Sequence, residues 1–355
     1  MSTPRASAPS TTPIQTMDSP LIPDSDSTHS SDEGAQGDTC SLTASITDYP
    51  MHWGRRYHRY REGAYMFPND ENEQNRLDKQ HAILTQLHRR LFFAPLDPNE
   101  VQNVLDIGTG TGIWPIALAD ANVLPYATIT GTDLSPVQPD DVPPNVYFEV
   151  QDCAEEDWYR NPNFDYCHVR FMAGSLASYK DLIQTSRKYL RPGHGWLECQ
   201  EIHPTPVSDD NTIPEEWPMK VWEENLNHAA TECVEPPRPV RIAPNIKTWM
   251  EEAGYVDIHE HITKIPLGPW PRDRRLKDIG GWWLTNWLDG LQGFTYKLFS
   301  TDGLMWSQEE IEVHLADVRR AAWLRSVHAY QRHYVVYGRR PTREEEHMVR
   351  LYGRG

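Results

Sequence analysis

The chain has 355 residues and a formal net charge of −17, because 51 Asp and Glu residues outnumber 34 Lys and Arg residues. Its length fits one large α/β domain with additions, or two domains. The acidic excess argues against strong nonspecific binding to nucleic acid, which depends on basic side chains that neutralise phosphates. No segment resembles a membrane-spanning helix of about 18 apolar residues or a secretory signal with a basic start and an apolar core. We expect neither a membrane nor a direct nucleic-acid partner.

Residues 1–46 differ in composition from the rest of the chain. Ser, Thr, Pro and Asp dominate this stretch, aromatic residues are almost absent, and the apolar residues show no periodicity. Such a segment buries too little apolar surface to offset the entropy lost on ordering. We predict a disordered tail.

The five cysteines are scattered, and no two of them form a Cys-x-x-Cys pair. This spacing argues against a zinc site, and we expect no metal. Cys167 and Cys199 stand in apolar runs, which is typical of small buried side chains in a reducing compartment.

Residues 47–98 are predicted to form an N-terminal helical segment. Asp70 and Glu73 have the spacing of a capping box, so we expect a helix to start at Asp70. The leucines that follow share one helical face: Leu77, Leu84, Leu87 and Leu91. Pro95 and Pro98 are expected to end the helix.

Residues 99–270 alternate between strand-like and helix-like patterns. Short apolar runs predict strands over 103–107, 127–132, 146–150, 164–171 and 195–202, with helices over 113–121 and 179–189. A further helix over 246–253, closed by Gly254, and a strand over 255–265 follow. This order predicts an α/β Rossmann-like domain, with a parallel sheet covered by helices on both faces.

Residues 271–355 are predicted to form a C-terminal helical cap. Aromatic and apolar residues recur at helical spacing: Trp282, Trp283, Trp287, Leu288 and Leu291. Ser307 and Glu310 have capping-box spacing, and a stripe of Ile311, Leu315, Val318 and Ala322 follows. We expect these helices to cover the sheet and to shape one side of a substrate cleft.

The strongest sequence signal is Val104-Leu-Asp-Ile-Gly-Thr-Gly-Thr-Gly112, a strand that runs into a glycine-rich turn and then a helix. This order is typical of the nucleotide-binding half of a doubly wound fold. Gly108 and Gly110 permit backbone angles that other residues resist, and they let a ligand approach the main chain. Gly112 allows the helix to pack close to the strand.

Two acids follow at the ends of the next predicted strands. Asp133 comes 21 residues after Gly112, where a carboxylate can accept hydrogen bonds from both ribose hydroxyls. Asp152 follows the third strand, where a carboxylate can bind the exocyclic amine of adenine. Because the carboxyl ends of parallel strands share one edge, these features are expected to face one ligand crevice.

The loop favours S-adenosylmethionine (SAM) over a dinucleotide. Its G-x-G-x-G spacing is one residue tighter than the G-x-G-x-x-G that delivers a helix N-terminus to pyrophosphate. Asp106, two residues before the first glycine, would repel pyrophosphate. The same acid suits a ligand with a sulfonium and an ammonium group, directly or through water.

The segment Asp106–Gly112 resembles motif I of the class I SAM-dependent methyltransferases, with Asp133 and Asp152 at matching acidic positions. Longer stretches resemble the fungal LaeA-type methyltransferase-like regulators: Gly54-Arg-Arg-Tyr-His58, Asp70-Glu-Asn-Glu-Gln-Asn-Arg-Leu-Asp78, Gly108-Thr-Gly-Thr-Gly-Ile-Trp114, Asp133-Leu-Ser-Pro-Val-Gln-Pro139 and Leu190-Arg-Pro-Gly193. The similarity runs from about Trp53 to about Tyr330. At Thr109 the regulator itself often has Cys and close paralogues often have Thr, so the chain resembles either one.

This resemblance implies a seven-stranded, mostly parallel sheet with extra helices at both ends. It implies the cofactor-binding residues Asp106, Gly108, Thr109, Gly110, Gly112, Asp133, Leu134, Asp152 and Cys153. It further implies a nuclear location, with the cytoplasm as a second one, and velvet-domain protein partners in the control of metabolite gene clusters and sporulation. The alternatives are a cytosolic enzyme that methylates a small metabolite, a non-catalytic SAM-binding scaffold and, last, an NAD-dependent oxidoreductase.

The methyl acceptor is not defined by the sequence. The predicted strand over 164–171 is expected to end beside the methyl group, and no Asn/Asp-Pro-Pro-Tyr/Phe follows it, which weighs against methylation of amides or base amines. The polar residues near the predicted strand ends are His168, Arg170, Glu198, Glu201 and His203. None of them is assigned as a catalytic base.

Overall fold

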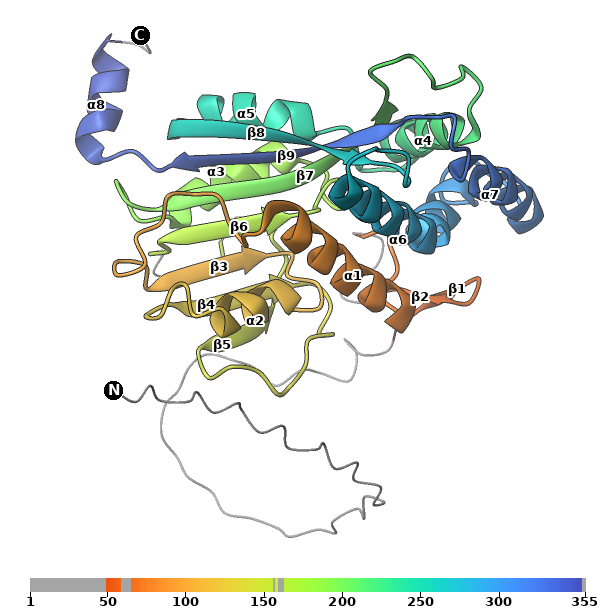
Figure 1. Cartoon of the computed structure of the whole chain (residues 1–355). Coiled ribbons are helices and arrows are strands. Elements are labelled where there is room, and N and C mark those ends of the chain that lie inside the picture. Colours follow the sequence, from red (N-terminus) through yellow and green to blue (C-terminus); the bar gives the residue numbers. More distant parts are fainter. Residues whose placement is uncertain (1–48, 59–64, 156, 159–162, 353–355) are drawn as a thin grey trace, which may run out of the picture. The chain divides into compact units, whose positions relative to one another are not determined.

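The computed structural model describes residues 49–58, 65–155, 157–158 and 163–352, and its main feature is a seven-stranded sheet (Figure 1). The strand order is β5–β4–β3–β6–β7–β9–β8. These strands are β3 (Asn103–Ile107), β4 (Thr128–Asp133), β5 (Val146–Val150), β6 (Tyr166–Arg170), β7 (Trp196–Val207), β8 (Val256–Pro266) and β9 (Tyr330–Arg339). Because β9 runs antiparallel to both β7 and β8 while the other pairs are parallel, the sheet is mostly parallel. The predicted fold class is confirmed, and the predicted tail over residues 1–46 lies outside the described residues.

Helices cover both faces of this sheet. The described helices are α1 (Glu71–His88), α2 (Ile113–Asp120), α3 (Tyr179–Tyr189), α4 (Pro218–His228), α5 (Ile246–Ala253), α6 (Arg274–Phe299), α7 (Gln308–Ala322) and α8 (Arg343–Tyr352). In Figure 1, α2 lies in front of the sheet and α3 and α5 lie behind it. The small hairpin of β1 (Met51–His52) and β2 (Arg55–Arg56), the π-helical segment η1 (Ala229–Cys233) and the 3₁₀ segment η2 (Ala243–Asn245) complete the elements. Of the described helices, none is both long and apolar enough to span a bilayer.

The central strands are buried and bring their carboxyl ends to one edge. In β3 every residue after Asn103 is buried, as expected for a strand covered on both faces. The parallel register pairs Asp106 of β3 with Gly131 of β4 on one side and with His168 of β6 on the other. The glycine loop therefore begins beside the ends of both neighbouring strands.

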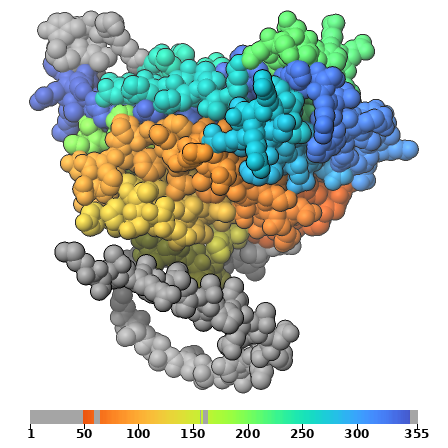
Figure 2. Space-filling model, viewed as in Figure 1, coloured from red at the N-terminus to blue at the C-terminus, as the bar shows by residue number. Residues whose placement is uncertain are grey.

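A hydrophobic cluster lies beside the sheet, between α1, α4, α6 and α7. From α1 it takes Ile83, Leu84 and Leu87, and from α6 it takes Trp283, Leu284, Trp287 and Leu291. These residues recur at helical spacing, so each helix presents one apolar stripe to the other. The surfaces of α1 and α6 meet in Figure 2. This packing fixes α1 over the sheet edge that carries the glycine loop.

The first helix is shorter than its sequence predicts. It begins after Asp70, as predicted, but ends at His88, well before Pro95. Arg89 adopts a left-handed conformation (φ 56°), and its N–H donates to the Thr85 carbonyl, which closes the last turn. Leu91 therefore leaves the helix and packs with the cluster around α2 instead.

The prediction of an entirely helical cap over residues 271–355 is wrong in part. The helices α6, α7 and α8 are present, but β9 lies inside the sheet between β7 and β8. Polar residues at the start of β9 hide the strand signal in the sequence. Gln331 accepts from the Trp283 indole and donates to the Pro204 carbonyl, and His333 hydrogen bonds to His88. Because Gln331 and the Nδ1 atom of His333 have partners, the strand can be buried.

Other local predictions are confirmed. The helix α3 spans Tyr179–Tyr189, and α5 ends at Gly254, whose φ of 85° suits glycine. The Ser307–Glu310 capping box is complete, with both reciprocal hydrogen bonds. The domain boundaries at 98/99 and 270/271 stay predictions.

Asp70 is predicted to stabilise the fold more than an ordinary helix cap does. Its carboxylate accepts from the Glu73 N–H and binds the buried Arg55 guanidinium at 2.5 and 2.9 Å. Asp70→Ala removes the cap and leaves a buried guanidinium without its partner, so we expect the free energy of unfolding to fall by about 2–4 kcal/mol. The matched control Ser307→Ala removes an exposed cap and should cost about 1 kcal/mol. Equal losses in urea unfolding would contradict the role given to the ion pair.

Candidate functional site

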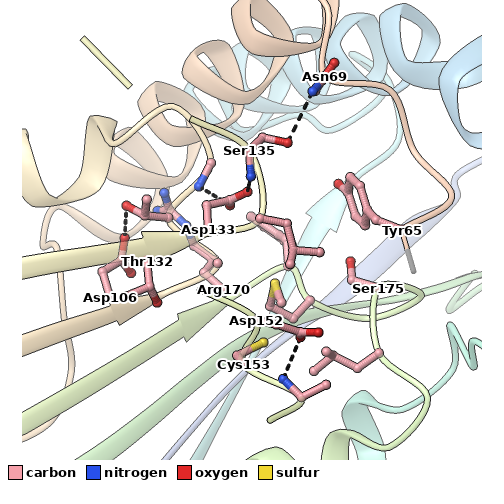
Figure 3. Close-up of a pocket in the computed structure, with 18 of the residues that line it drawn as sticks. Tyr65, Asn69, Asp106, Thr132, Asp133, Ser135, Asp152, Cys153, Arg170 and Ser175 are labelled. Carbon is pink, nitrogen blue, oxygen red and sulfur yellow. Dashed lines mark hydrogen bonds between the residues drawn. The ribbon is translucent and has the colours of Figure 1, made fainter. Parts of the chain in front are cut away.

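A cavity of about 450 Å³ lies at the carboxyl ends of the central strands, and we call it the first cavity (Figure 3). Its volume falls in the range of small-molecule sites. The predicted cofactor-binding residues line it, with the exception of Gly112: Asp106, Gly108, Thr109, Gly110, Asp133, Leu134, Asp152 and Cys153. The structure therefore brings together residues from the ends of three consecutive strands, as the sequence predicts.

The glycine loop between β3 and α2 has a backbone that only glycine adopts readily. Gly108 and Gly110 have φ values of 70° and 59°. The N–H groups of Gly108 and Thr109 both donate to the Thr132 carbonyl at 2.9 Å, which ties the loop to β4. A Cβ atom on Gly108 would lie 2.2 Å from the Met172 sulfur. The loop thus exposes main chain to the first cavity.

Gly112 serves packing, and it does not line the first cavity. It is the N-cap of α2 with a φ of 78°, and a Cβ atom there would lie 2.3 Å from the Phe148 ring. This close approach agrees with the predicted contact between helix and sheet. Its assignment as a cofactor-binding residue stays a prediction, while its predicted packing role agrees with the structure.

Asp133 joins the two loops that enclose the first cavity. One carboxylate oxygen accepts from the Gly110 N–H at 2.9 Å, and the other accepts from the Ser135 N–H at 2.9 Å. Burial raises the pKa of Asp133 to about 6, although these N–H groups oppose the rise; the charge of Asp106 adds to it. Each oxygen keeps a second acceptor position, so the carboxylate can still bind ribose hydroxyls.

Asp106 is a structural acid as well as a lining residue. Its two oxygens accept from the Thr109 hydroxyl at 2.6 Å and contact the His168 imidazole at 2.7 Å. His168 is fully buried and stacks on Trp114 with ring centroids 3.9 Å apart. His168 does not line the first cavity, which favours its interpretation as a packed strand histidine over a role at the site of methyl transfer. A cationic ligand would meet an acid that is already held in place.

Arg170 is a cation at the end of β6 that lines the first cavity. Its guanidinium contacts the His81 Nδ1 atom at 3.2 Å, and within the described residues it forms no ion pair with a carboxylate. Burial lowers its pKa, and the nearby charge of Asp106 opposes this. The site therefore offers a guanidinium for a ligand carboxylate on the side of Asp106.

The opposite part of the first cavity contains Asp152 and Cys153. One oxygen of Asp152 accepts from the Ala154 N–H at 2.9 Å, and burial raises the pKa of the Cys153 thiol to about 12. Arg238 donates to the Ser175 carbonyl. Burial lowers the pKa of Arg238, and the negative charge of Asp152 opposes this. This part combines a carboxylate with a neutral thiol and fits the adenine end that the sequence predicts.

The structure adds residues from α1 and from its preceding loop to the site. Tyr65, Asn69, Leu77 and Gln80 line the first cavity, and the Asn69 amide donates to the Ser135 hydroxyl at 3.2 Å. Of these, Leu77 lies in the Asp70–Asp78 stretch that carries part of the family resemblance, and the others lie just outside it. The reason for this stretch is now visible, because Asp78 accepts from the Thr111 hydroxyl at 2.6 Å and so ties α1 to the glycine loop.

Gln138 explains the other specific stretch, the one that begins at Asp133. Its amide donates to the Gly110 carbonyl at 2.6 Å and to the Ser135 carbonyl at 3.0 Å. The side chain therefore bridges the glycine loop and the loop after β4. Both sequence stretches hold the wall of the first cavity.

A smaller cavity of about 160 Å³ adjoins the first, and we call it the second cavity. Both cavities share the lining residues Tyr65, Glu73, Leu77, Gln80 and Phe171. Of the polar residues predicted near the strand ends, Glu201 lines the second cavity, whereas Glu198 and His203 line neither. Glu198 instead accepts from the Phe93 and Ala94 N–H groups, which is a structural role.

The first cavity fits SAM in size and in charge. Asp106 and Asp133 disfavour a pyrophosphate, and they suit a ligand with a positive charge near the glycine loop. Asp133 would hold the ribose hydroxyls, Arg170 the carboxylate of the methionine part, and Leu134, Asp152 and Cys153 the adenine. Gly108 has no side chain, and the Met172 side chain occupies the space that a Cβ atom there would take.

Comparison with known proteins gives consistent relatives. A model described as a methyltransferase domain matches residues 75–260. Methyltransferase pytC of Aspergillus terreus is 42% identical over 85% of this chain and 91% of its own length. Secondary metabolism regulator LAE1 of Cochliobolus heterostrophus is 34% identical over 82% and 94%, and protein-methionine methyltransferase laeA of Emericella nidulans is 32% identical over 82% and 76%.

The pKa of Asp133 predicts a pH-dependent affinity for S-adenosylhomocysteine. Below about pH 6 the carboxyl becomes protonated and loses the charge that favours hydroxyl donors, so the affinity at pH 5 should be up to about tenfold lower than at pH 7.5. Asp133→Asn should bind more weakly and show no such dependence. Titration calorimetry at both pH values measures the effect.

The unliganded fold should respond with the opposite sign. Because the pKa of Asp133 is higher in the folded chain than in the unfolded one, the fold gains stability from this group as the pH falls from about 6 towards 4. The assignment would be contradicted if both the affinity and the stability fell between pH 6 and pH 4, and if Asp133→Asn showed the same decrease as the wild type.

Arg170 is predicted to distinguish ligands by their amino-acid part. Arg170→Met should weaken S-adenosylhomocysteine binding by about 10- to 100-fold, because a hydrogen bond to a charged group is lost. It should change the binding of 5′-methylthioadenosine, which lacks the amino-acid part, by less than about twofold. Arg238→Met is the matched control, since Arg238 lies beside Asp152 and should affect both ligands alike. An equal loss for both ligands in Arg170→Met would reject this placement.

Proposed function

The chain belongs to the methyltransferase-domain family, among the relatives of the fungal LaeA-type proteins, and from this premise we propose that it methylates a small molecule held in the second cavity. It is a SAM-dependent methyltransferase with a role in secondary metabolism. What the family leaves open is the acceptor, and the shape of the site bears on this question.

The observation that carries the proposal is the position of the second cavity. It shares five lining residues with the first cavity, so a group bound in one lies beside a group bound in the other. Its walls come from α1, β7, α4, α6 and β9, which surround it on several sides. An enclosed cavity of this kind can surround a small acceptor, whereas the flat surface of a protein acceptor would not fit into it.

The cofactor supplies a methyl group that its sulfonium activates, and the chain contributes position and exclusion of water. Asp133 and the glycine loop would hold the ribose end of the cofactor, and Arg170 would hold its carboxylate end, so that the donor is aligned. Leu77 and Phe171 line both cavities and so mark the boundary between them. Holding two reactants in such an orientation supplies much of the rate of a transfer that needs little other chemistry.

The test is transfer of label to small molecules by the purified chain alone. Incubation with tritium-labelled SAM and an organic extract of the source cells should give label in the solvent-extractable fraction. Asp133→Ala should give no label, whereas Glu215→Gln, an exposed acid that lines neither cavity, should behave as wild type. Label found in protein and never in the solvent fraction would reject a small-molecule acceptor.

The relatives support a second candidate, a nuclear regulator that acts with velvet-domain proteins on metabolite gene clusters and sporulation. Its support is the 34% identity to secondary metabolism regulator LAE1 over 94% of that protein. A tagged chain would then accumulate in nuclei, with the cytoplasm as its second location, and would co-purify with velvet-domain proteins. An evenly distributed chain that co-purifies with none of them would reject this candidate.

A further inference from the structure

The second cavity is walled mainly by aromatic rings. These are Phe67, Phe171, Trp222, Trp283, Trp287 and Phe294. Trp222 meets Trp287 edge to face with centroids 4.8 Å apart, and Phe67 meets Phe294 in the same way at 5.6 Å. Rings in this arrangement offer both faces and edges to a further ring.

The size of the second cavity admits about one ring. Its volume is about 160 Å³, and an apolar protein cavity of about 150 Å³ is known to bind benzene. A ligand of two or three fused rings would need to extend out of this chamber. The cavity therefore selects a group of the size of a single six-membered ring.

Most polar groups in the wall are already paired. Glu73 and Arg76 form an ion pair with contacts of 2.6 and 2.9 Å, and Arg76 also donates to Gln80 at 2.6 Å. The Trp222 indole donates to Thr295 and the Trp283 indole donates to Gln331. These groups offer little charge to a ligand, so the cavity favours a neutral one.

Glu201 is the exception. Its Oε1 atom accepts from the Met172 N–H at 2.6 Å, while Oε2 is buried and, among the described lining residues, is the buried side-chain polar atom without a hydrogen-bond partner. Burial raises the pKa of Glu201 to about 8; the Met172 N–H opposes this most strongly, and the Ala173 N–H and the Tyr179 hydroxyl oppose it less. The group therefore carries a proton near neutral pH, and because Oε1 faces an N–H, the proton belongs on Oε2.

The chain turns sharply where the two cavities meet. Phe171 has a φ of 58°, which a bulky residue rarely adopts, and its N–H donates to the Gln200 carbonyl. This turn lets Phe171 line both cavities and directs the Met172 N–H to Glu201. Backbone strain of this kind is typical of functional sites. It places the carboxyl group beside the boundary that a methyl group would cross.

We infer that the second cavity binds a single neutral aromatic ring with a hydroxyl group, and that this phenolic oxygen hydrogen bonds to Oε2 of Glu201. The inference rests on the proposed function, since it names the class of the small acceptor. The ring fills the chamber of aromatic side chains. The hydroxyl gives Oε2 of Glu201 a hydrogen bond that none of the described side chains lining the second cavity supplies.

The test uses two probes that differ by the hydroxyl alone, 4-fluorophenol and fluorobenzene. Fluorine NMR titrations on the full chain saturated with S-adenosylhomocysteine give the affinity of each. Glu201→Met should weaken 4-fluorophenol about threefold to tenfold more than it weakens fluorobenzene, because one net hydrogen bond is lost. Glu201→Gln keeps a hydrogen-bonding group and the acceptor for Met172, so it should retain most of the difference. Glu215→Gln is the exposed control.

A second variant tests the cavity and leaves the side chain of Glu201 unchanged. Ala173 lines the second cavity and not the first, so Ala173→Leu should abolish the binding of both probes and leave the affinity for S-adenosylhomocysteine unchanged. The inference is overturned if Glu201→Met weakens both probes equally, or if both probes still bind to Ala173→Leu. Probe binding as expected, combined with no labelled small molecule in the transfer assay, would instead reject the proposed function alone.

Discussion

The site depends on one buried carboxylate, that of Asp133. It is the shared acceptor for the Gly110 N–H of the glycine loop and the Ser135 N–H of the loop after β4. A buried carboxylate is costly unless donors surround it, so the two loops and the acid stabilise one another. Gln138 repeats the link with its amide. The first cavity has its shape because this acid needs both loops.

The helix α1 joins this site to the rest of the fold. At its start Asp70 binds Arg55, in its middle Asp78 accepts from Thr111 of the glycine loop, and its apolar stripe packs on α6. The helix thereby covers the first cavity and brings α6, with its tryptophans, to the second. A displacement of α1 caused by a change at its N-cap would therefore alter the walls of both cavities.

The sequence predicts what is local and misses what depends on distant pairing. The glycine loop, Asp133 and the caps of α1 and α7 follow from short patterns. The capping box of α7 is complete, whereas at α1 the Asp70 cap forms but the Glu73 carboxylate binds Arg76 instead of closing the box. The strand β9 was missed because Gln331 and His333 look exposed until their partners, Trp283 and His88, are known. The second cavity was missed because its wall comes from segments separated by more than 200 residues, from Phe67 to Gln331. The role of Asp106 was only half predicted, since its partner His168 lies on the neighbouring strand.

The two cavities divide the chemistry of the reaction between them. The first contains ionisable groups that can still bind a ligand, the carboxylate of Asp133 as an acceptor and the guanidinium of Arg170 as a donor, and it suits a ligand that carries charges of both signs. The second contains polar groups that are paired with one another, apart from Glu201, and it suits a neutral ligand. With SAM bound, transfer of its methyl group to a neutral hydroxyl would pass the positive charge to the acceptor oxygen, which would then release its proton. A low-dielectric chamber on the acceptor side would favour the transition state of this transfer, because its dispersed charge needs less solvation than the localised charge of the sulfonium.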